Sequence, residues 1–378
     1  MIDIRYLVIS DIHLGNRRNK TTEILHNLNV YFDHYNSSSQ FTEMDIIFIA
    51  GDLFDTLLDF SNSDIHEITS WMGRLMYFCF NNNIKLRLLE GTPSHDWGQS
   101  KICQTLKDIL KLDLDFKYVE KLHIEHMEDK GLHILYIPDE WTSSADLTFS
   151  QVKELMKDNN ISEVDIAIMH GAFDYQLKNI PGNGQKHSEG AYLGIVKHFI
   201  NIGHIHTFSN YDKIIAEGSF DRMSHGEEEA KGGVVCTIAA NGNNYFNFIE
   251  NKGAKIFKTI TIRNADLDKA FATVHKALSK IPENSFVRIK AKKDHPLYVA
   301  FEELKLKYPM YYFSKTALED EAVGQQMLSQ IQMFDSDYSP ITITPGNIVD
   351  MLTSSITSKY DLNDGQLNLL SGLLGATL

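Results

Sequence analysis

Cysteine is scarce in this chain of 378 residues, which holds only Cys79, Cys103 and Cys236, widely spaced. Three scattered thiols exclude a zinc–thiolate cluster and fit a reducing compartment better than a disulfide-stabilised secreted fold. Long hydrophobic runs are also missing, because no apolar stretch approaches the ~20 residues that span a bilayer. The segment from Met1 leads straight into a strand-like run rather than a signal peptide. We therefore expect a cytoplasmic protein with no membrane partner.

Positive charge is in short supply. Lys and Arg number 36 against 50 Asp and Glu, so the formal net charge is −14, whereas a stand-alone nucleic-acid-binding protein is usually basic. Acidic residues gathered around metal ions would explain part of the excess, because a bound cation reverses the local charge. Six basic residues in two local clusters are candidates for nucleic-acid contact, with a solvated surface as the alternative: Arg17, Arg18, Lys20, Lys290, Lys292 and Lys293.

Apolar runs of strand length alternate with helix-length segments through the first part of the chain, with helices expected up to about residue 35 and over residues 65–80. This alternation predicts parallel strands joined by helical crossovers. Further short strands predict a second sheet. We expect an α/β fold in which two sheets form a sandwich core flanked by helices. The expected strands cover residues 4–9, 46–50, 84–89, 122–126, 132–137, 164–169, 198–202, 234–239 and 245–249.

Four segments follow from changes in this pattern. Residues 1–252 hold all of the strands above, and residues 253–316 are expected to form a small α+β capping domain. Residues 317–343 are polar and irregular, which is typical of a linker. Residues 344–378 are predicted to form a tail of short Leu-rich helices, which cannot make a core alone. We expect this tail to dock on a partner helix, with packing onto its own domain as the alternative.

Asp and His recur in five short motifs, each directly after a strand-like apolar run. Loops that follow neighbouring strands meet at one edge of a sheet, so we expect the motifs to build one site. Carboxylate and imidazole ligands without thiolate suit a pair of divalent ions. Each motif alone is often only a turn or a buried core residue, but their joint occurrence favours a site. The motifs are Asp11-Ile12-His13, Gly51-Asp52-Leu53-Phe54-Asp55, Ser94-His95-Asp96, His170-Gly171 and Gly203-His204-Ile205-His206.

In this order the motifs resemble those of the calcineurin-like metallophosphoesterases, whose pattern is D-x-H, G-D-x-x-D/H, G-N-H-D/E, H and G-H-x-H. Within that superfamily the chain looks most like the SbcD-type DNA repair nucleases, and in particular the small subunits of phage recombination exonucleases. Leu53-Phe54-Asp55 carries this likeness, as does Gly218-Ser219-Phe220 with Arg222. The specific motifs cover about residues 4–250, and the rest is similar in layout only.

The resemblance implies a metallophosphoesterase fold with two divalent metal ions. The ligand types leave Mn²⁺, Fe²⁺ and Zn²⁺ open, and the resemblance favours Mn²⁺. Asp52 would bridge the ions, since its carboxylate has two oxygens. The implied ligands are Asp11, His13 and His206 for one ion, His170 and His204 for the other, and Asp52 for both.

Three further residues would support the chemistry. His95 would stabilise charge on the phosphoryl oxygens or protonate the leaving oxygen. Asp96 would orient His95, and Asp55 would lie behind the metal ligands. One position departs from the family pattern, because Ser94 stands where Asn is expected and Gly91 has moved two residues away. A hydroxyl is a shorter and weaker ligand than an amide oxygen, but Ser94 stays a candidate ligand of the second ion.

The resemblance implies a two-metal-dependent DNA phosphodiesterase that acts as an exonuclease. Whether it also acts as an endonuclease stays open. The sequence has no Gly-x₄-Gly-Lys-Ser/Thr motif, so ATP hydrolysis would belong to a separate subunit. The resemblance implies an SMC-like coiled-coil ATPase of SbcC type, which we expect to bind residues 345–378, within a homodimeric complex in the cytoplasm (of the host, if phage-encoded). Two alternatives stay open: a phosphoesterase for small molecules or phosphoproteins, and a non-catalytic binding scaffold on the same fold.

Overall fold

A computed structural model describes residues 3–37, 44–59, 61–177 and 185–318. Met1–Ala317 form one compact unit. The predicted tail over residues 344–378 and nearly all of the predicted linker over residues 317–343 lie outside the described residues. The docking role expected for residues 345–378 therefore stays a prediction.

The first sheet has six strands in the order β12-β11-β1-β2-β3-β4. Strands β1 to β4 pair in parallel, and β11 and β12 are added antiparallel. Every residue of β2 is buried, which is why its sequence is a continuous apolar run rather than an alternating one. The strands are β1 (Ile4–Ile9), β2 (Ile46–Ala50), β3 (Lys85–Leu89), β4 (Phe116–Val119), β11 (Gly232–Ile238) and β12 (Tyr245–Glu250).

The second sheet also has six strands, in the order β5-β6-β7-β8-β10-β9. The pairs β6–β7, β7–β8 and β8–β10 are parallel, and the two edge strands β5 and β9 are antiparallel to their neighbours. The strands are β5 (His123–Met127), β6 (Leu132–Ile137), β7 (Val164–His170), β8 (Val196–Gly203), β9 (Ser209–Tyr211) and β10 (Ile214–Ala216).

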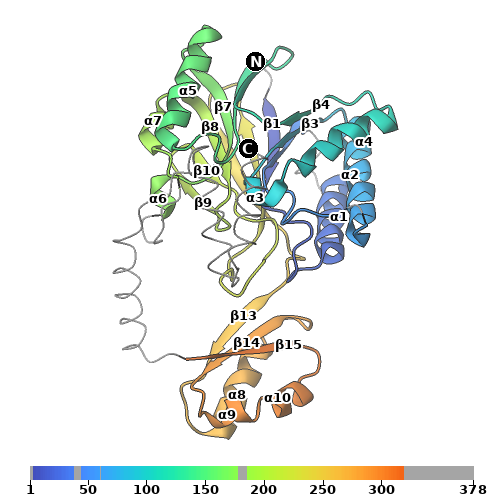
Figure 1. Ribbon diagram of the computed structural model, residues 1–378, viewed down its shortest axis with the longest axis vertical. Helices are drawn as coiled ribbons and strands as arrows, with labels where there is room; N and C mark the ends of the chain where they lie inside the picture. Colours follow the sequence, from blue (N-terminus) through green and yellow to red (C-terminus); the bar gives the residue numbers. More distant parts are fainter. Residues whose placement is uncertain (1–2, 38–43, 60, 178–184, 319–378) are drawn as a thin grey trace, which may run out of the picture. The chain divides into compact units, whose positions relative to one another are not determined.

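Helices flank the two sheets (Figure 1). Tyr6 and Phe48 of the first sheet share one buried cluster with Tyr136 and Ile168 of the second, so the sheets pack against each other. Separate clusters on the outer faces hold the helices in place. This confirms the predicted α/β class with two large mixed sheets. The helices are α1 (Thr21–Ser37), α2 (Ser63–Asn81), α3 (Pro93–Asp96), α4 (Ile102–Leu110), α5 (Ala145–Asp158), α6 (Asp174–Leu177) and α7 (Glu189–Leu193), with a 3₁₀ turn, η1 (Gln99–Lys101).

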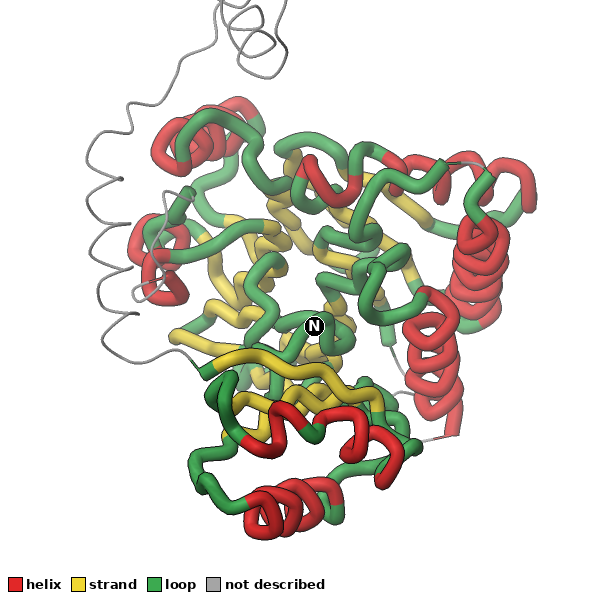
Figure 2. Tube along the Cα trace, turned by 60° about the horizontal axis from the view of Figure 1, so that its bottom comes forward, coloured by secondary structure: helices red, strands yellow, loops and turns green. Residues whose placement is uncertain are grey.

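The last described part of the chain forms a small sheet of three parallel strands with its own buried cluster, which includes Val274, Ile289 and Leu297. Its helices lie on one face of the sheet in both views (Figures 1 and 2). Helical crossovers explain the parallel pairing. The elements are β13 (Phe257–Thr261), α8 (Leu267–Leu278), β14 (Phe286–Ala291), α9 (Pro296–Val299), α10 (Phe301–Lys307) and β15 (Tyr312–Ala317).

Candidate metal centre

The Asp and His motifs all lie at the carboxyl ends of parallel strands, where backbone hydrogen bonds tie their loops together. The Ile12 N–H donates to the Asp52 carbonyl oxygen at 2.9 Å, which joins the loops after β1 and β2. The His204 N–H donates to the Asp11 carboxylate, with 2.9 Å to Oδ2, which joins the two sheets. The loops thus form one connected unit rather than five independent turns.

Four of the motif residues have a strained backbone. The φ angles of Asp11, His13, Asp52 and His204 are 50°, 55°, 49° and 96°. Left-handed φ angles in residues with a Cβ cost of order 1–3 kcal/mol each and persist where the surrounding structure enforces them. Their concentration at one place indicates a functional site.

Two glycines allow the loops to approach closely. A Cβ on Gly51 would lie 2.2 Å from His170 Nδ1, and a Cβ on Gly91 would lie 2.1 Å from the Asp52 backbone nitrogen. Both distances are shorter than any real contact, so these positions require glycine. The Gly-Asp pattern at residues 51–52 therefore has a packing reason in addition to its turn.

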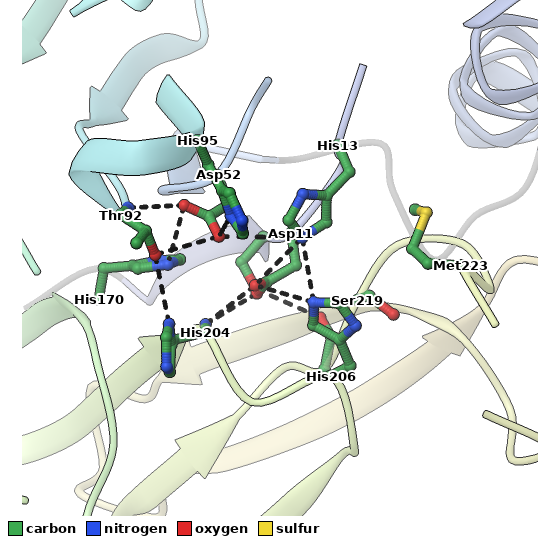
Figure 3. A network of polar contacts seen from close by, with 12 residues as sticks. Asp11, His13, Asp52, Thr92, His95, His170, His204, His206, Ser219 and Met223 are labelled. Atoms are coloured by element: carbon green, nitrogen blue, oxygen red, sulfur yellow. Dashed lines mark hydrogen bonds and ion pairs between the residues drawn. The ribbon is translucent and has the colours of Figure 1, made fainter. Parts of the chain in front are cut away.

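The first ligand group joins Asp11, His13 and His206, whose ligand atoms all lie within 4.8 Å of one another. His13 Nε2 and His206 Nε2 face each other at 3.0 Å (Figure 3). Asp11 Oδ1 lies 3.9 Å from the first of these nitrogens and 3.7 Å from the second. Two imidazole nitrogens at this distance need a proton or a metal ion between them, because two lone pairs repel.

The second ligand group joins Asp52, His170 and His204. His170 Nδ1 lies 2.7 Å from the Ala50 carbonyl oxygen, to which it donates. The buried Nε2 then points at Asp52 Oδ1, 3.2 Å away, with no hydrogen-bond partner among the described residues. A backbone carbonyl behind the ring is the usual arrangement of a metal-ligating histidine. The residues present therefore fit the implied ions.

Burial disfavours the charged forms of Asp52 and His170, but the attraction between their opposite charges outweighs this effect. The charge of His170 and the hydrogen bond with His95 hold the pKa of Asp52 well below its usual range despite burial. Asp52 in turn raises the pKa of His170 well above its usual value, although burial alone would lower it. The pocket thus favours a cation beside Asp52, whether a proton or a metal ion.

His95 lies on α3 and contacts the shared carboxylate. Its Nδ1 is 2.7 Å from Asp52 Oδ2, and this hydrogen bond raises the pKa of His95. His13, Asp52 and His95 form a third group of potential ligand atoms within 4.8 Å. The structure thus brings together seven of the predicted residues: Asp11, His13, Asp52, His95, His170, His204 and His206.

The predicted partnership of Asp96 with His95 is wrong. Both Asp96 oxygens accept backbone N–H groups instead, from Phe54 at 2.9 Å and from Gly91 at 2.8 Å. Neighbouring residues on a helix point about 100° apart, so the two side chains diverge. Burial, with the nearby carboxylates of Asp52 and Glu90, raises the pKa of Asp96 to about 8. Asp96 fixes the loops after β2 and β3.

The prediction for Ser94 is also corrected. Ser94 is exposed on α3, and Thr92 lies at the second ligand group instead. The Thr92 N–H donates to Asp52 Oδ1 at 2.6 Å, and its Oγ1 lies 3.3 Å from His204 Nδ1. Gly91-Thr92 therefore occupies the place expected for Gly-Asn, and two inserted residues precede His95. The glycine directly before Thr92 was the sequence signal for this.

Three carboxylates stand beside the histidines. Asp55 Oδ1 lies 3.3 Å from His13 Nδ1, in agreement with its predicted place behind the ligands. Asp139 and Glu227 were not predicted. Asp139 Oδ2 lies 3.4 Å from His204 Nδ1, and its position two residues after the apolar run of β6 was the available signal. Glu227 Oε1 lies 3.3 Å from His206 Nδ1, in an irregular segment that gave no signal.

Glu227 is charged at neutral pH. Burial opposes its ionisation, but the hydrogen bond with His206 and the charge of Lys231 lower the pKa of Glu227 to about 2. Lys231 Nζ lies 3.1 Å from Glu227 Oε2 and is itself buried. A carboxylate in this position sets the orientation of the imidazole ring.

The two basic clusters have different positions. The first cluster is exposed in the loop between His13 and α1: Arg17, Arg18 and Lys20. Asn16 anchors this loop, because its Nδ2 donates to Asp55 Oδ1 at 2.8 Å and its Oδ1 accepts the Arg18 N–H at 2.9 Å. The second cluster is exposed at the end of β14 and in the turn after it: Lys290, Lys292 and Lys293.

No protein-family profile matches the sequence, and no curated protein matches it either. Among solved structures, GAP50, the anchor in the inner membrane complex of Plasmodium, is 15% identical, with 73% of this chain and 95% of that chain covered and a TM-score of 0.39. TT1561 of Thermus thermophilus is 8% identical, with 65% and 98% covered and a TM-score of 0.38. Likenesses at this level carry no argument about fold family or function.

Within the described part of the chain, every helix is too short or too polar to cross a membrane.

Proposed function

We propose that this protein is a two-metal-dependent phosphodiesterase that acts on DNA, with the fold and chemistry of the SbcD-type metallophosphoesterases. The observation that carries the proposal is the sharing of Asp52. Its carboxylate belongs both to the group with His170 and His204 and to the group with His13 and His95. A carboxylate between two sets of imidazoles is what a pair of divalent ions requires.

The layered fold supports the same proposal. The ligands come from the carboxyl ends of strands in both sheets, which is where α/β proteins form their sites. Two large mixed sheets flanked by helices, with the proposed ligands on loops at one end, support this proposal. The strained residues in these loops add weight, because strain is kept where function needs it.

Each residue has a role in this proposal. Two divalent ions, expected to be Mn²⁺, would neutralise phosphate charge and supply an acidified water when bound. The first group would hold one ion and the second group the other, with Asp52 between them. His95, fixed through Nδ1 by Asp52, is left with Nε2 to donate a hydrogen bond to a phosphoryl or leaving oxygen. Glu227 fixes the ring of His206, and Asp55 lies beside the ring of His13.

Several features favour DNA as the substrate. Arg17, Arg18 and Lys20 lie on the loop that follows His13, where they would contact the phosphate backbone. The small domain with Lys290, Lys292 and Lys293 would act as a cap that contacts DNA. An SMC-like ATPase subunit bound through residues 345–378 would supply ATP hydrolysis and hold much of the DNA, in a homodimeric complex in the cytoplasm.

The experiment compares substrates of different size. Wild type with Mn²⁺ is expected to degrade end-labelled linear DNA and to hydrolyse bis-p-nitrophenyl phosphate. His95→Ala is expected to lose at least about 100-fold of both activities, the range for one group that stabilises transition-state charge. His66→Ala, an exposed histidine on α2, is the matched control and should retain them.

Each other outcome selects a different function. Hydrolysis of the small ester or of a phosphopeptide without DNA degradation would point to a small-molecule or phosphoprotein phosphoesterase. No activity on any substrate, also in the presence of the ATPase partner, would leave the binding scaffold as the function and refute the enzyme.

A further inference from the structure

The hydroxyl of Thr92 lies between two carboxylate oxygens and an imidazole nitrogen whose role depends on its tautomer. Thr92 Oγ1 is 3.3 Å from Asp52 Oδ2, 3.1 Å from Asp139 Oδ2 and 3.3 Å from His204 Nδ1. A hydroxyl donates a single proton, so it can satisfy only one of these atoms. Two carboxylate oxygens therefore converge on one shared hydroxyl.

The position of Asp139 follows from the sheet. Strand β6 pairs in parallel with β7, with Ile137 opposite Met169, so Asp139 reaches the same edge as His170. Asp139 Oδ1 accepts the Glu140 N–H at 2.9 Å, which turns Oδ2 toward the second ligand group. Its side chain is only 9% exposed. The carboxylate is thus fixed and largely removed from solvent.

A second observation points to a cation at the same place. His170 is fully buried, and its Nε2 has no hydrogen-bond partner among the described residues. This nitrogen is aimed at Asp52, whose other oxygen faces Thr92. An unpartnered buried nitrogen beside converging carboxylates is costly unless a cation joins them.

We propose that Asp139 is a ligand of the second metal ion, with Thr92 Oγ1 beside it, at the place where the related pattern has the amide of Asn. This assignment rests on the proposed two-metal centre. It gives the second ion two carboxylates, Asp52 and Asp139, together with His170 and His204. An anionic oxygen in place of a neutral amide strengthens the attraction for a hard divalent ion.

A positioning role for Asp139 is the competing explanation, because its Oδ2 also lies beside His204 Nδ1. A thiolate probe separates the two roles. Asp139→Cys places sulfur at the proposed ligand position, and thiolate bonded to Co²⁺ gives a charge-transfer absorption that a thiol merely near the ion does not. Cys79, Cys103 and Cys236 are all buried, so the native thiols give no background.

The full chain is stripped of metal by chelation and titrated with Co²⁺ under reducing conditions. Asp139→Cys is expected to develop the charge-transfer band, and Glu140→Cys, one residue further on an exposed site, is expected not to. In parallel, Mn²⁺ binding is counted by the loss of the free-ion paramagnetic resonance signal. Asp139→Ala should bind the second Mn²⁺ at least about tenfold more weakly, the lower limit for groups that support a metal site.

The outcomes are distinguishable. Absence of the band in Asp139→Cys, or two Mn²⁺ bound by Asp139→Ala as tightly as by wild type, overturns the ligand role and leaves the two-metal proposal standing. Failure of wild type itself to bind two Mn²⁺ overturns both. A melting temperature of metal-free Asp139→Ala at or above that of wild type shows that the variant folds, and it is expected because the variant removes one of two neighbouring negative charges.

Discussion

At the scale of single residues, a carboxylate lies behind each histidine ring of the first ligand group. His13 has Asp55 at its Nδ1 and His206 has Glu227 at its Nδ1, each at 3.3 Å. These contacts turn both Nε2 atoms toward each other. A carboxylate that accepts from Nδ1 fixes the tautomer and raises the basicity of the ligating nitrogen. Glu227 therefore prepares the Nε2 of His206 for an ion, while Asp55 lies beside His13 Nδ1 without a hydrogen bond to it.

Removal of the Glu227 carboxylate tests its role in positioning His206. Glu227→Gln is expected to weaken the first Mn²⁺ by about 10–100-fold, the range for partners of ligating histidines, because the amide no longer sets the His206 ring. Calorimetric titration of the metal-free protein measures this. Glu228→Gln is the control, since Glu228 pairs with Lys258 instead; an equal loss in both variants would contradict the assigned role.

The ligands themselves could be predicted because each directly follows a strand, where the alternation of apolar runs and polar ends is visible in the sequence. Glu227 could not, since it follows no strand and reaches His206 only through the fold. Thr92 lay within reach of the same reasoning, but the two inserted residues before His95 hid its position. Contacts that depend on where two distant loops meet leave little trace in a single sequence.

At the scale of elements, the loops after β2 and β3 are held by Asp96. Its oxygens accept the N–H groups of Phe54 and Gly91, and Gln99 adds a bond from its Nε2 to the Thr56 carbonyl oxygen at 3.0 Å. Side chains on and just after the short helix α3 therefore hold the loops after β2 and β3 together. This explains why His95, on the same helix, has a fixed place beside Asp52.

Loss of these hydrogen bonds is expected to cost stability as well as activity. Asp96→Ala leaves two buried N–H groups without an acceptor, at about 1–3 kcal/mol each. The free energy of unfolding of the metal-free protein should therefore fall by about 2–6 kcal/mol in urea titrations. Asp113→Ala, an exposed carboxylate, serves as the control. An unchanged free energy of unfolding in Asp96→Ala would show that the backbone groups find other acceptors.

At the scale of the whole molecule, a buried polar chain crosses the interface between the sheets. The Tyr6 hydroxyl of the first sheet donates to Asn201 Oδ1 at 3.1 Å, and Asn201 Nδ2 of the second donates to Glu217 Oε1 at 2.6 Å. Glu217 is fully buried, and this burial raises its pKa to about 8 from an ordinary value of 4.5. The interface therefore contains an acid that stays protonated at neutral pH.

The protonated Glu217 makes the folding stability depend on pH. The native state binds this proton more tightly than the unfolded chain does, so its stabilisation is complete below pH 4.5 and is lost as pH rises toward about 8. The loss is on the order of a few kcal/mol. Glu217→Gln should therefore gain stability relative to wild type between about pH 5 and pH 8, measured by urea unfolding without metal. A difference between the two proteins that does not change with pH would contradict the buried protonated acid.

The two-sheet architecture could be predicted as a class, because the buried strands are continuous apolar runs and the half-buried ones alternate. The polar chain through Glu217 could not, since Tyr6 lies far from Asn201 and Glu217 in sequence and no local pattern shows which distant residue a buried polar side chain contacts. The long-range pairing of β1 with β11 was equally hidden, because nothing local specifies which distant strand completes a sheet.

The first and second ligand groups both draw on the two sheets. Asp11 and His13 come from the first sheet and His206 from the second, while Asp52 comes from the first and His170 and His204 from the second. A bound ion would thus link the two sheets, and any movement of one sheet relative to the other would break bonds to the ion. Metal binding and folding stability are then linked. An ion at about 100 times its dissociation constant adds about 2.7 kcal/mol to the free energy of unfolding.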